Sequence, residues 1–109
     1  MKIIIKGTQI DLTSSIKVYI EEKLSVIEKL IPDNYKEVSQ ARVEVGRPSQ
    51  HHKKGNVYFA EINLSVGRSL YRATEEDSDV RTAIDKARDE IKTQLRREKE
   101  KMIQKRDIE

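Results

Sequence analysis

The hydrophobic period of this chain changes along its length, and that change limits the folds that it can adopt. Between Val57 and Val66, apolar and polar residues alternate, so that every second side chain falls on one apolar face. Strict alternation predicts a β-strand with one buried face. Between Ile16 and Ile31, apolar residues instead recur every three to four positions, which predicts an amphipathic helix. A chain with both periods has to cover the apolar face of a sheet with helices.

Three further strands are predicted from local sequence. The isoleucines of Lys2–Lys6 favour a short pleated segment. Alternation in Ala41–Val45 predicts a half-buried strand that ends at Gly46-Arg47-Pro48. After the strand at 57–66, Gly67-Arg68 can turn the chain back into Ser69–Ala73 and form a hairpin. Hairpin connections make the sheet mostly antiparallel.

Two helices complete the pattern. The first has Thr13 or Ser14 as its N-cap and stops at Pro32, and the second is capped by Asp77 or Ser78. The apolar stripe of the second helix consists of Val80, Ile84, Ala87, Ile91, Leu95 and Met102. The element order is β-α-β-β-β-α. We therefore expect an α+β fold in which a four-stranded, mostly antiparallel sheet carries two helices packed on one face.

Length and composition narrow the function. The 109 residues fit a single domain spanning 1–109, and the absence of cysteine excludes disulfides, thiol chemistry and cysteine-ligated metal sites. The first apolar run is too short for a signal peptide or a membrane span, so we expect a cytoplasmic protein that does not bind membranes. Aromatic residues make up only 5% of the chain, which argues against a surface that stacks single-stranded bases.

Catalytic and metal sites find little support. His51-His52 are the only histidines, and they lie beside Lys53 and Lys54 in a polar loop between Pro48 and Gly55. A solvated basic loop is the better interpretation than a metal site, because the lysines disfavour a cation. No hydroxyl has a histidine at activating spacing, and no glycine-rich phosphate loop is present. We expect no enzyme activity, no cofactor, no metal and no small-molecule substrate.

The second predicted helix is rich in positive charge. From Lys86 to Arg106 it holds nine basic residues and four acidic ones. On a helical projection, one flank of the apolar stripe carries Arg81, Arg88, Lys92, Lys99 and Arg106, and the other flank or the arc beyond it carries Lys86, Arg97, Lys101 and Lys105. Two basic edges suit the phosphates of an RNA surface. The alternative is a solvated face with i,i+3 and i,i+4 ion pairs, such as Asp85 and Asp89 with Arg88 and Lys92.

Local motifs give a family resemblance. The first helix has Leu12-Thr13, then Tyr19-Ile20-Glu21-Glu22-Lys23-Leu24, and the later segments are Leu70-Tyr71-Arg72-Ala73, Asp79-Val80-Arg81-Thr82-Ala83-Ile84-Asp85 and Ile91-Lys92-Thr93-Gln94-Leu95-Arg96-Arg97-Glu98-Lys99. Together they resemble the ribosome hibernation-promoting factor and ribosome-associated inhibitor family, also known as the sigma-54 modulation protein family. The resemblance implies a translation-silencing factor that binds the small ribosomal subunit through rRNA phosphates, in the channel used by mRNA and tRNA, without catalysis.

The resemblance also implies binding residues. Lys23 and Lys29 match basic positions of the first helix, Arg72 matches the basic strand position, and Arg97 with Lys99 or Lys101 matches the basic end of the second helix. Arg81 stands where the family has tyrosine, Glu90 where it has lysine and Thr93 where it has arginine. We expect neighbouring basic residues to compensate, so the predicted rRNA-binding set is Lys23, Lys29, Arg72, Arg81, Lys86, Arg88, Lys92, Arg96, Arg97, Lys99 and Lys101.

Several alternatives stay open. Because the chain ends close behind the second helix, the resemblance implies a short family form without a C-terminal dimerisation domain, which either helps or opposes ribosome pairing. One face of the sheet and two helix stripes account for the apolar residues, so we expect a monomer off the ribosome. A protein-binding regulator without RNA and a general RNA-binding module are the competing functions. Only RNA binding through several phosphates falls steeply with salt.

Overall fold

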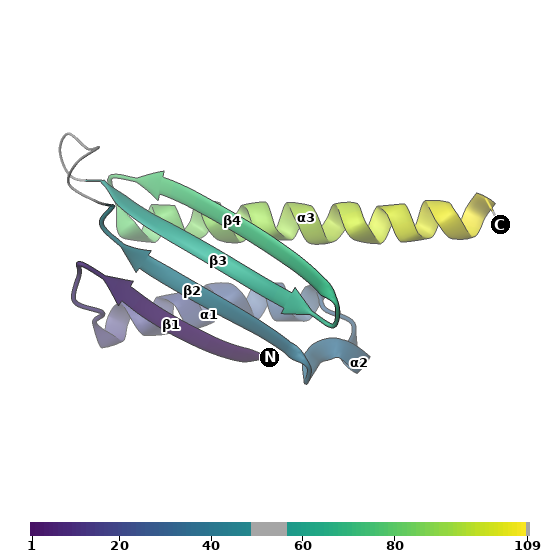
Figure 1. Cartoon of the computed structure of the whole chain (residues 1–109), viewed down its shortest axis with the longest axis horizontal. Coiled ribbons are helices and arrows are strands. Elements are labelled where there is room, and N and C mark those ends of the chain that lie inside the picture. The colour runs from purple at the N-terminus through teal and green to yellow at the C-terminus, as the bar shows by residue number, and fades with distance from the viewer. Residues whose placement is uncertain (49–56, 109) are drawn as a thin grey trace.

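The computed structural model describes residues 1–48 and 57–108, with side chains up to Lys101. The four strands β1 (Lys2–Thr8), β2 (Ser39–Gly46), β3 (Tyr58–Val66) and β4 (Ser69–Asp77) form one sheet in sequence order (Figure 1). The strand pair β1–β2 is parallel, and the other two pairs are antiparallel. The predicted α+β class and element order are therefore confirmed. The polar loop with His51-His52 lies outside the described residues, as does the side chain of Met102.

The hairpin between β3 and β4 turns where the sequence predicts it. Gly67 has a φ of 59°, which an L side chain adopts only with strain. A Cβ atom on Gly67 would also lie 3.1 Å from Cε1 of Tyr35. Glycine is needed here for both reasons. The second strand then continues further than the predicted Ser69–Ala73, since β4 pairs with β3 as far as Asp77.

The first helix, α1 (Ser14–Leu30), begins and ends at its predicted signals. The Thr13 hydroxyl oxygen accepts a hydrogen bond from the Ile16 amide at 3.2 Å, which makes Thr13 the N-cap. Pro32 follows the last turn and stops the helix. The next element, α2 (Asp33–Lys36), was not predicted, because four residues are too few to show a hydrophobic period. Its ends are joined by an ion pair between Lys36 and Asp33 at 2.8 Å.

The second long helix, α3 (Val80–Ile108), has a different cap from the predicted one. Asp79 caps it, because one carboxylate oxygen accepts hydrogen bonds from the Thr82 amide at 3.3 Å and the Thr82 hydroxyl at 2.8 Å. These bonds hold the pKa of Asp79 below its usual range, the hydroxyl bond contributing most. Asp77 instead accepts from the Asp79 amide at 2.9 Å. The prediction of Asp77 or Ser78 as the cap was wrong, since three consecutive residues suited the role.

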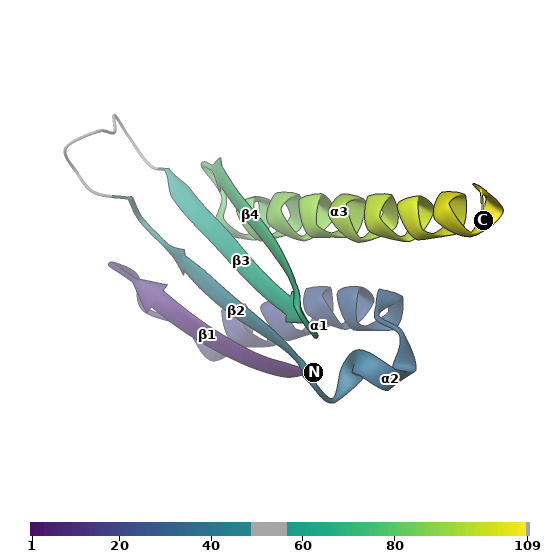
Figure 2. The ribbon, with the colours of Figure 1, turned by 45° about the vertical axis from the view of Figure 1, so that its right-hand side comes forward.

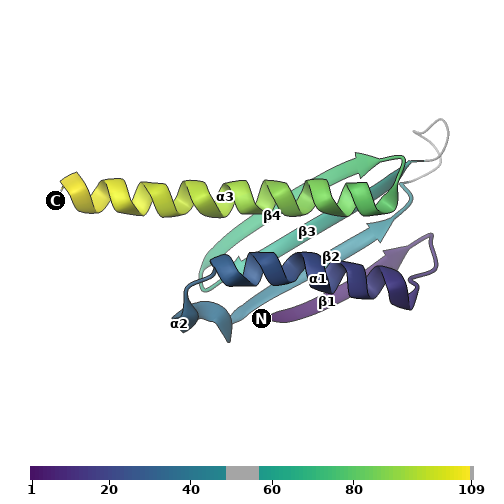
Figure 3. The same cartoon turned by 180° about the vertical axis from the view of Figure 1, so that it is seen from behind.

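Both long helices pack on one face of the sheet, as predicted (Figure 3). The core between the two layers is a single apolar cluster, with the side chains of β2, β3 and both helices at its centre. The residues with the largest fully buried side chains are Ile20, Leu24, Ile27, Val45, Ile62, Leu64, Ile84 and Ile91. The opposite face of the sheet is covered by none of the described elements (Figure 1). We call it the open sheet face.

The helix α3 is much longer than the sheet that supports it. Its buried positions end at Ile91, and Leu95 is the last partly buried apolar residue that packs on the core. Beyond that point the helix runs past the end of the sheet (Figure 2). All six side chains from Arg96 to Lys101 are exposed. We call residues 96–108 the projecting half of α3.

Candidate nucleic-acid interface

Two basic groups of the predicted set meet where α1 and α3 lie side by side. A tyrosine of α1, Tyr19, is half-buried between the helices, and its hydroxyl donates to Oδ1 of Asp85 at 2.7 Å. The ammonium of Lys23 lies 5.1 Å from the centre of the Tyr19 ring, and the guanidinium of Arg81 lies 5.4 Å from it. We call this cluster of Ser15, Tyr19, Lys23, Arg81, Asp85 and Arg88 the helix seam.

Charge in the helix seam is only partly neutralised. Lys23 Nζ is 3.8 Å from Asp85 Oδ1, and within the described residues the Arg81 side chain donates a hydrogen bond only to the Ser15 hydroxyl, at 3.5 Å. Arg88 is held by its neighbour Asp89, at 2.8 Å from Nη2. Burial, followed by the hydrogen bond to Asp85, raises the pKa of Tyr19 to about 12. The phenol is therefore neutral at physiological pH and leaves the cluster positively charged.

From Lys92 onward, α3 carries cations that have no acidic partner among the described side chains. Among the described side chains, no carboxylate lies within 4.0 Å of the basic groups of Lys92, Arg96, Arg97, Lys99 and Lys101. The ion pairs made by the described part of α3 join it to α1 or to β4, or join two adjacent residues of α3 itself. The i,i+3 and i,i+4 pairs of the solvated-face interpretation are thus not formed in α3 as far as Lys101. Five cations along one helix remain available to an external anion.

Three predicted binding residues lie elsewhere. Lys86 donates to the Glu76 carbonyl oxygen at 2.6 Å and lies 3.8 Å from Asp77, so it ties α3 to the end of β4. Lys29 is exposed in the last turn of α1. Arg72 points to the open sheet face, because its neighbour Ala73 is buried on the helix side. The predicted set therefore does not form one continuous patch.

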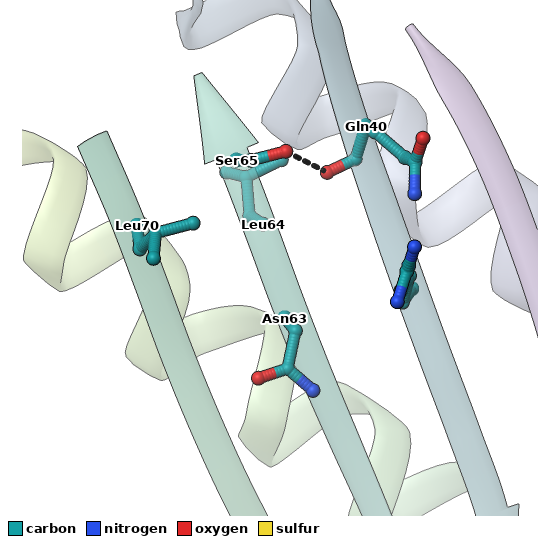
Figure 4. A pocket seen from close by; sticks show the side chains of 6 residues that line it. Gln40, Asn63, Leu64, Ser65 and Leu70 are labelled. Carbon is teal, nitrogen blue, oxygen red and sulfur yellow. Dashed lines mark hydrogen bonds between the residues drawn. The ribbon is translucent and has the colours of Figure 1, made fainter. Parts of the chain in front are cut away.

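The open sheet face has its own polar network and a shallow hollow. Arg72 pairs with Glu61 at 2.8 Å, and Glu61 also accepts from the Asn63 amide at 3.1 Å. Beside them, Gln40, Arg42, Asn63, Leu64, Ser65 and Leu70 line the hollow (Figure 4). The Ser65 hydroxyl in this hollow donates to the Gln40 carbonyl at 3.4 Å. Arg72 is thus engaged in a network that lies across the sheet from the helix seam.

Clustered metal ligands and membrane-spanning helices are both absent from the described part of the chain. No group of three His, Cys, Asp or Glu side chains gathers there to hold a metal ion. The histidine pair lies outside that part, so the absence of a metal site stays a prediction. None of the described helices combines the length and apolar character that crossing a lipid bilayer requires.

Sequence reasoning missed three residues of the helix seam, namely Ser15, Tyr19 and Asp85. Tyr19 and Asp85 are 66 positions apart, and neither shows a local sign of pairing. The only available signal was spacing. Ser15, Tyr19 and Lys23 lie four residues apart on one face of α1, so they had to share a neighbour.

Comparison with known proteins agrees with this structure. A ribosome hibernation promotion factor from Deinococcus radiodurans is 30% identical over 103 residues, which cover 94% of this chain and 51% of that protein. This chain thus spans about half the length of that relative. The crystal structure of the Thermus thermophilus Protein Y N-terminal domain is 32% identical, with a TM-score of 0.69 over 89% of this chain and 98% of the other.

A second solved structure supports the fold alone. The ribosomal subunit interface protein from Coxiella burnetii has a TM-score of 0.71 over 91% of this chain and 98% of its own, at 18% identity. The model of the family described as Sigma 54 modulation protein / S30EA ribosomal protein matches residues 3–103. That match covers most of the chain and confirms the family suggested by the sequence motifs. The chain therefore belongs to the Sigma 54 modulation protein / S30EA ribosomal protein family.

Proposed function

We propose that residues 1–109 form a single ribosome-binding domain that silences idle ribosomes without catalysis. Its partner is the small ribosomal subunit, and the bonds are made to rRNA phosphates in the channel used by mRNA and tRNA. Family membership supports a ribosomal role, as does the name of the Deinococcus relative. A cytoplasmic location follows from that partner. No cofactor, metal or small-molecule substrate is part of the proposal.

The observation that carries the proposal is the run of unpaired cations on α3. Lys92, Arg96, Arg97, Lys99 and Lys101 have no carboxylate partner among the described side chains, so their charge is free for phosphates. Arg81 and Lys23 of the helix seam add charge at the supported end of the same helix. A helix that projects from its domain can follow a groove of folded RNA. Phosphate contacts of this kind give affinity without base specificity.

The test is sedimentation of the full chain with purified small subunits, large subunits and intact ribosomes through sucrose gradients at several salt concentrations. We expect the protein to co-migrate with the small subunit and with intact ribosomes. Its affinity should fall by roughly 0.7–0.9 log units per log unit of salt for each phosphate contact. Binding that ignores salt would favour a protein-binding regulator. Equal binding to any RNA duplex would favour a general RNA-binding module.

A further inference from the structure

The helix seam holds two cations from different helices over one aromatic ring, Lys23 at 5.1 Å and Arg81 at 5.4 Å from the centre of the Tyr19 ring. We infer that it is a preformed site for one phosphate group, in which Arg81 and Lys23 bind the phosphate oxygens while Tyr19 and Asp85 position them. The identity of the natural ligand, a backbone phosphate of RNA, rests on the proposed function. A free polyphosphate shares the same chemistry, and the experiment below separates the two sources.

Arg81 is the main phosphate donor because its guanidinium is almost unused. It has five N–H donors, and its one hydrogen bond among the described residues is the long contact of 3.5 Å to the Ser15 hydroxyl. No carboxylate lies within 4.0 Å of it there. The Tyr19 ring fixes one side of the guanidinium at 5.4 Å without consuming a donor. The planar fork is therefore held in place and remains free for two phosphate oxygens.

Asp85 keeps Lys23 close to Arg81 while binding it only loosely. One atom, Oδ1, accepts the Tyr19 hydroxyl at 2.7 Å and lies 3.8 Å from Lys23 Nζ. The shorter contact shows that the carboxylate is oriented mainly by the phenol. Lys23 therefore has donors left for another acceptor. Two positive charges from different helices are held against one aromatic ring, and a bound anion would offset the repulsion between them.

Arg88 contributes positive charge to the helix seam but few free hydrogen-bond donors. Both its Nε and its Nη2 are bound to Oδ1 of Asp89, at 2.9 and 2.8 Å. Its charge still acts on the Tyr19 hydroxyl. The acidic groups that face the site are therefore Asp85 directly, Asp89 through Arg88, and Asp79, which caps α3 and whose charge interacts with that of Arg81 beyond ion-pair distance. The structure assigns binding to Arg81 and Lys23, and positioning to Tyr19 and Asp85.

The two ends of one hydrogen bond give opposite expectations. In Tyr19→Phe, Asp85 loses its phenol donor and turns to Lys23 and Arg81, so it competes with phosphate. We expect affinity for phosphate to fall by about two- to tenfold, the range of one net hydrogen bond. In Asp85→Asn, the amide oxygen still accepts from Tyr19, but the competing negative charge is gone. We expect affinity to rise severalfold. A purely structural bond would give a loss of affinity in both variants.

The measurement is a titration of the full, isotope-labelled chain with inorganic pyrophosphate, followed by nuclear magnetic resonance. We expect the largest shifts at the Arg81 side chain and along the facing turn of α1. Arg81→Gln should weaken binding by about tenfold or more, the effect of losing one charged hydrogen-bond donor. The matched controls are Arg68→Gln in the β3–β4 turn and Tyr35→Phe in α2. Both side chains are exposed and lie outside the helix seam, so these changes should leave the affinity for pyrophosphate unchanged.

The outcomes separate the site from the proposed function. Shifts centred away from the seam, equal affinity in Arg81→Gln, or weaker binding in Asp85→Asn would each overturn the phosphate site, whatever happens on the ribosome. If the seam binds pyrophosphate and the same variants shift small-subunit binding in the same order, the ligand is RNA phosphate. If wild-type protein binds pyrophosphate at the seam but no ribosomal subunit, the site stands with a free polyphosphate as ligand, and the proposed function fails. Circular dichroism confirms that each variant is folded.

Discussion

Reversing four cations of α3 should remove ribosome binding while leaving the fold intact. The changes are Lys92→Glu, Arg96→Glu, Arg97→Glu and Lys99→Glu. All four side chains lack a carboxylate partner among the described residues, and the last three are fully on the surface. Arg88 is left unchanged because its side chain is only 17% exposed and pairs with Asp89. The variant thus changes charge without breaking an internal contact.

The expected loss follows from counterion release. Four phosphate contacts carry a salt slope of roughly 2.8–3.6 log units per log unit of salt, taking 0.7–0.9 for each contact. At 0.1 M salt, affinity should fall by about a factor of a thousand or more, or about 4–5 kcal/mol of binding free energy. The free energy of unfolding should change by no more than about 0.5 kcal/mol for each surface substitution.

The assay is co-sedimentation with small subunits at 0.1 M salt, together with thermal unfolding followed by circular dichroism. A matched control reverses four cations away from α3, namely Lys2, Lys6, Arg42 and Arg68, which are also exposed and make no ion pair in the described part of the chain. The control variant has the same net charge as the α3 variant and should keep most of the wild-type affinity for the small subunit. If the α3 variant is folded and still co-sediments like wild type, or if both variants lose binding equally, α3 is not the RNA-binding element.

Four further predictions test the fold and the assembly. Ile91→Asp should unfold the chain, because it buries an unpaired carboxylate at a site with no exposure; a cooperative melt near the wild-type temperature would contradict this. Gly67→Val should lower the melting temperature through its positive φ and the nearby Tyr35 ring, whereas Gly67→Asn should lower it less. The pKa of Asp79 is lowered in the folded state, so its contribution to stability is present above the unfolded pKa and lost as pH falls through the folded pKa. In Asp79→Ala, the free energy of unfolding measured in urea should therefore depend less on pH between pH 6 and pH 3 than in the wild type. An unchanged pH profile would refute the role of Asp79 as the cap. Light scattering should show a monomer at micromolar concentration, before and after treatment with a chelator.

The sequence predicted those parts of the fold that depend on local periodicity. Alternation in β3 and helical spacing in α1 each follow from one buried face, so the ten residues from Val57 to Val66 and the sixteen from Ile16 to Ile31 were enough to identify them. Boundaries were less certain. Asp79 was missed as a cap because Asp77 and Ser78 are equally good acceptors in isolation, and only the turn out of β4 selects among them.

The candidate site was harder to predict because it depends on how the helices meet. Tyr19 and Asp85 resemble ordinary surface positions until the two helices are packed side by side. Arg72 was grouped with the helix residues by family resemblance alone. Its position beside Ala73 in an alternating strand already placed it on the other face of the sheet.

The projecting half of α3 affects how the sequence of this chain can vary during evolution. The side chains at positions 96–101 are all exposed, so nearly any charged or polar residue with good helix propensity keeps the fold. Selection can therefore adjust binding strength there, one charge at a time, without compromising folding. The helix seam offers no such latitude, because five of its six residues make contacts between α1 and α3. We expect natural sequence variation to be high in the projecting half of α3 and to drop sharply at Leu95.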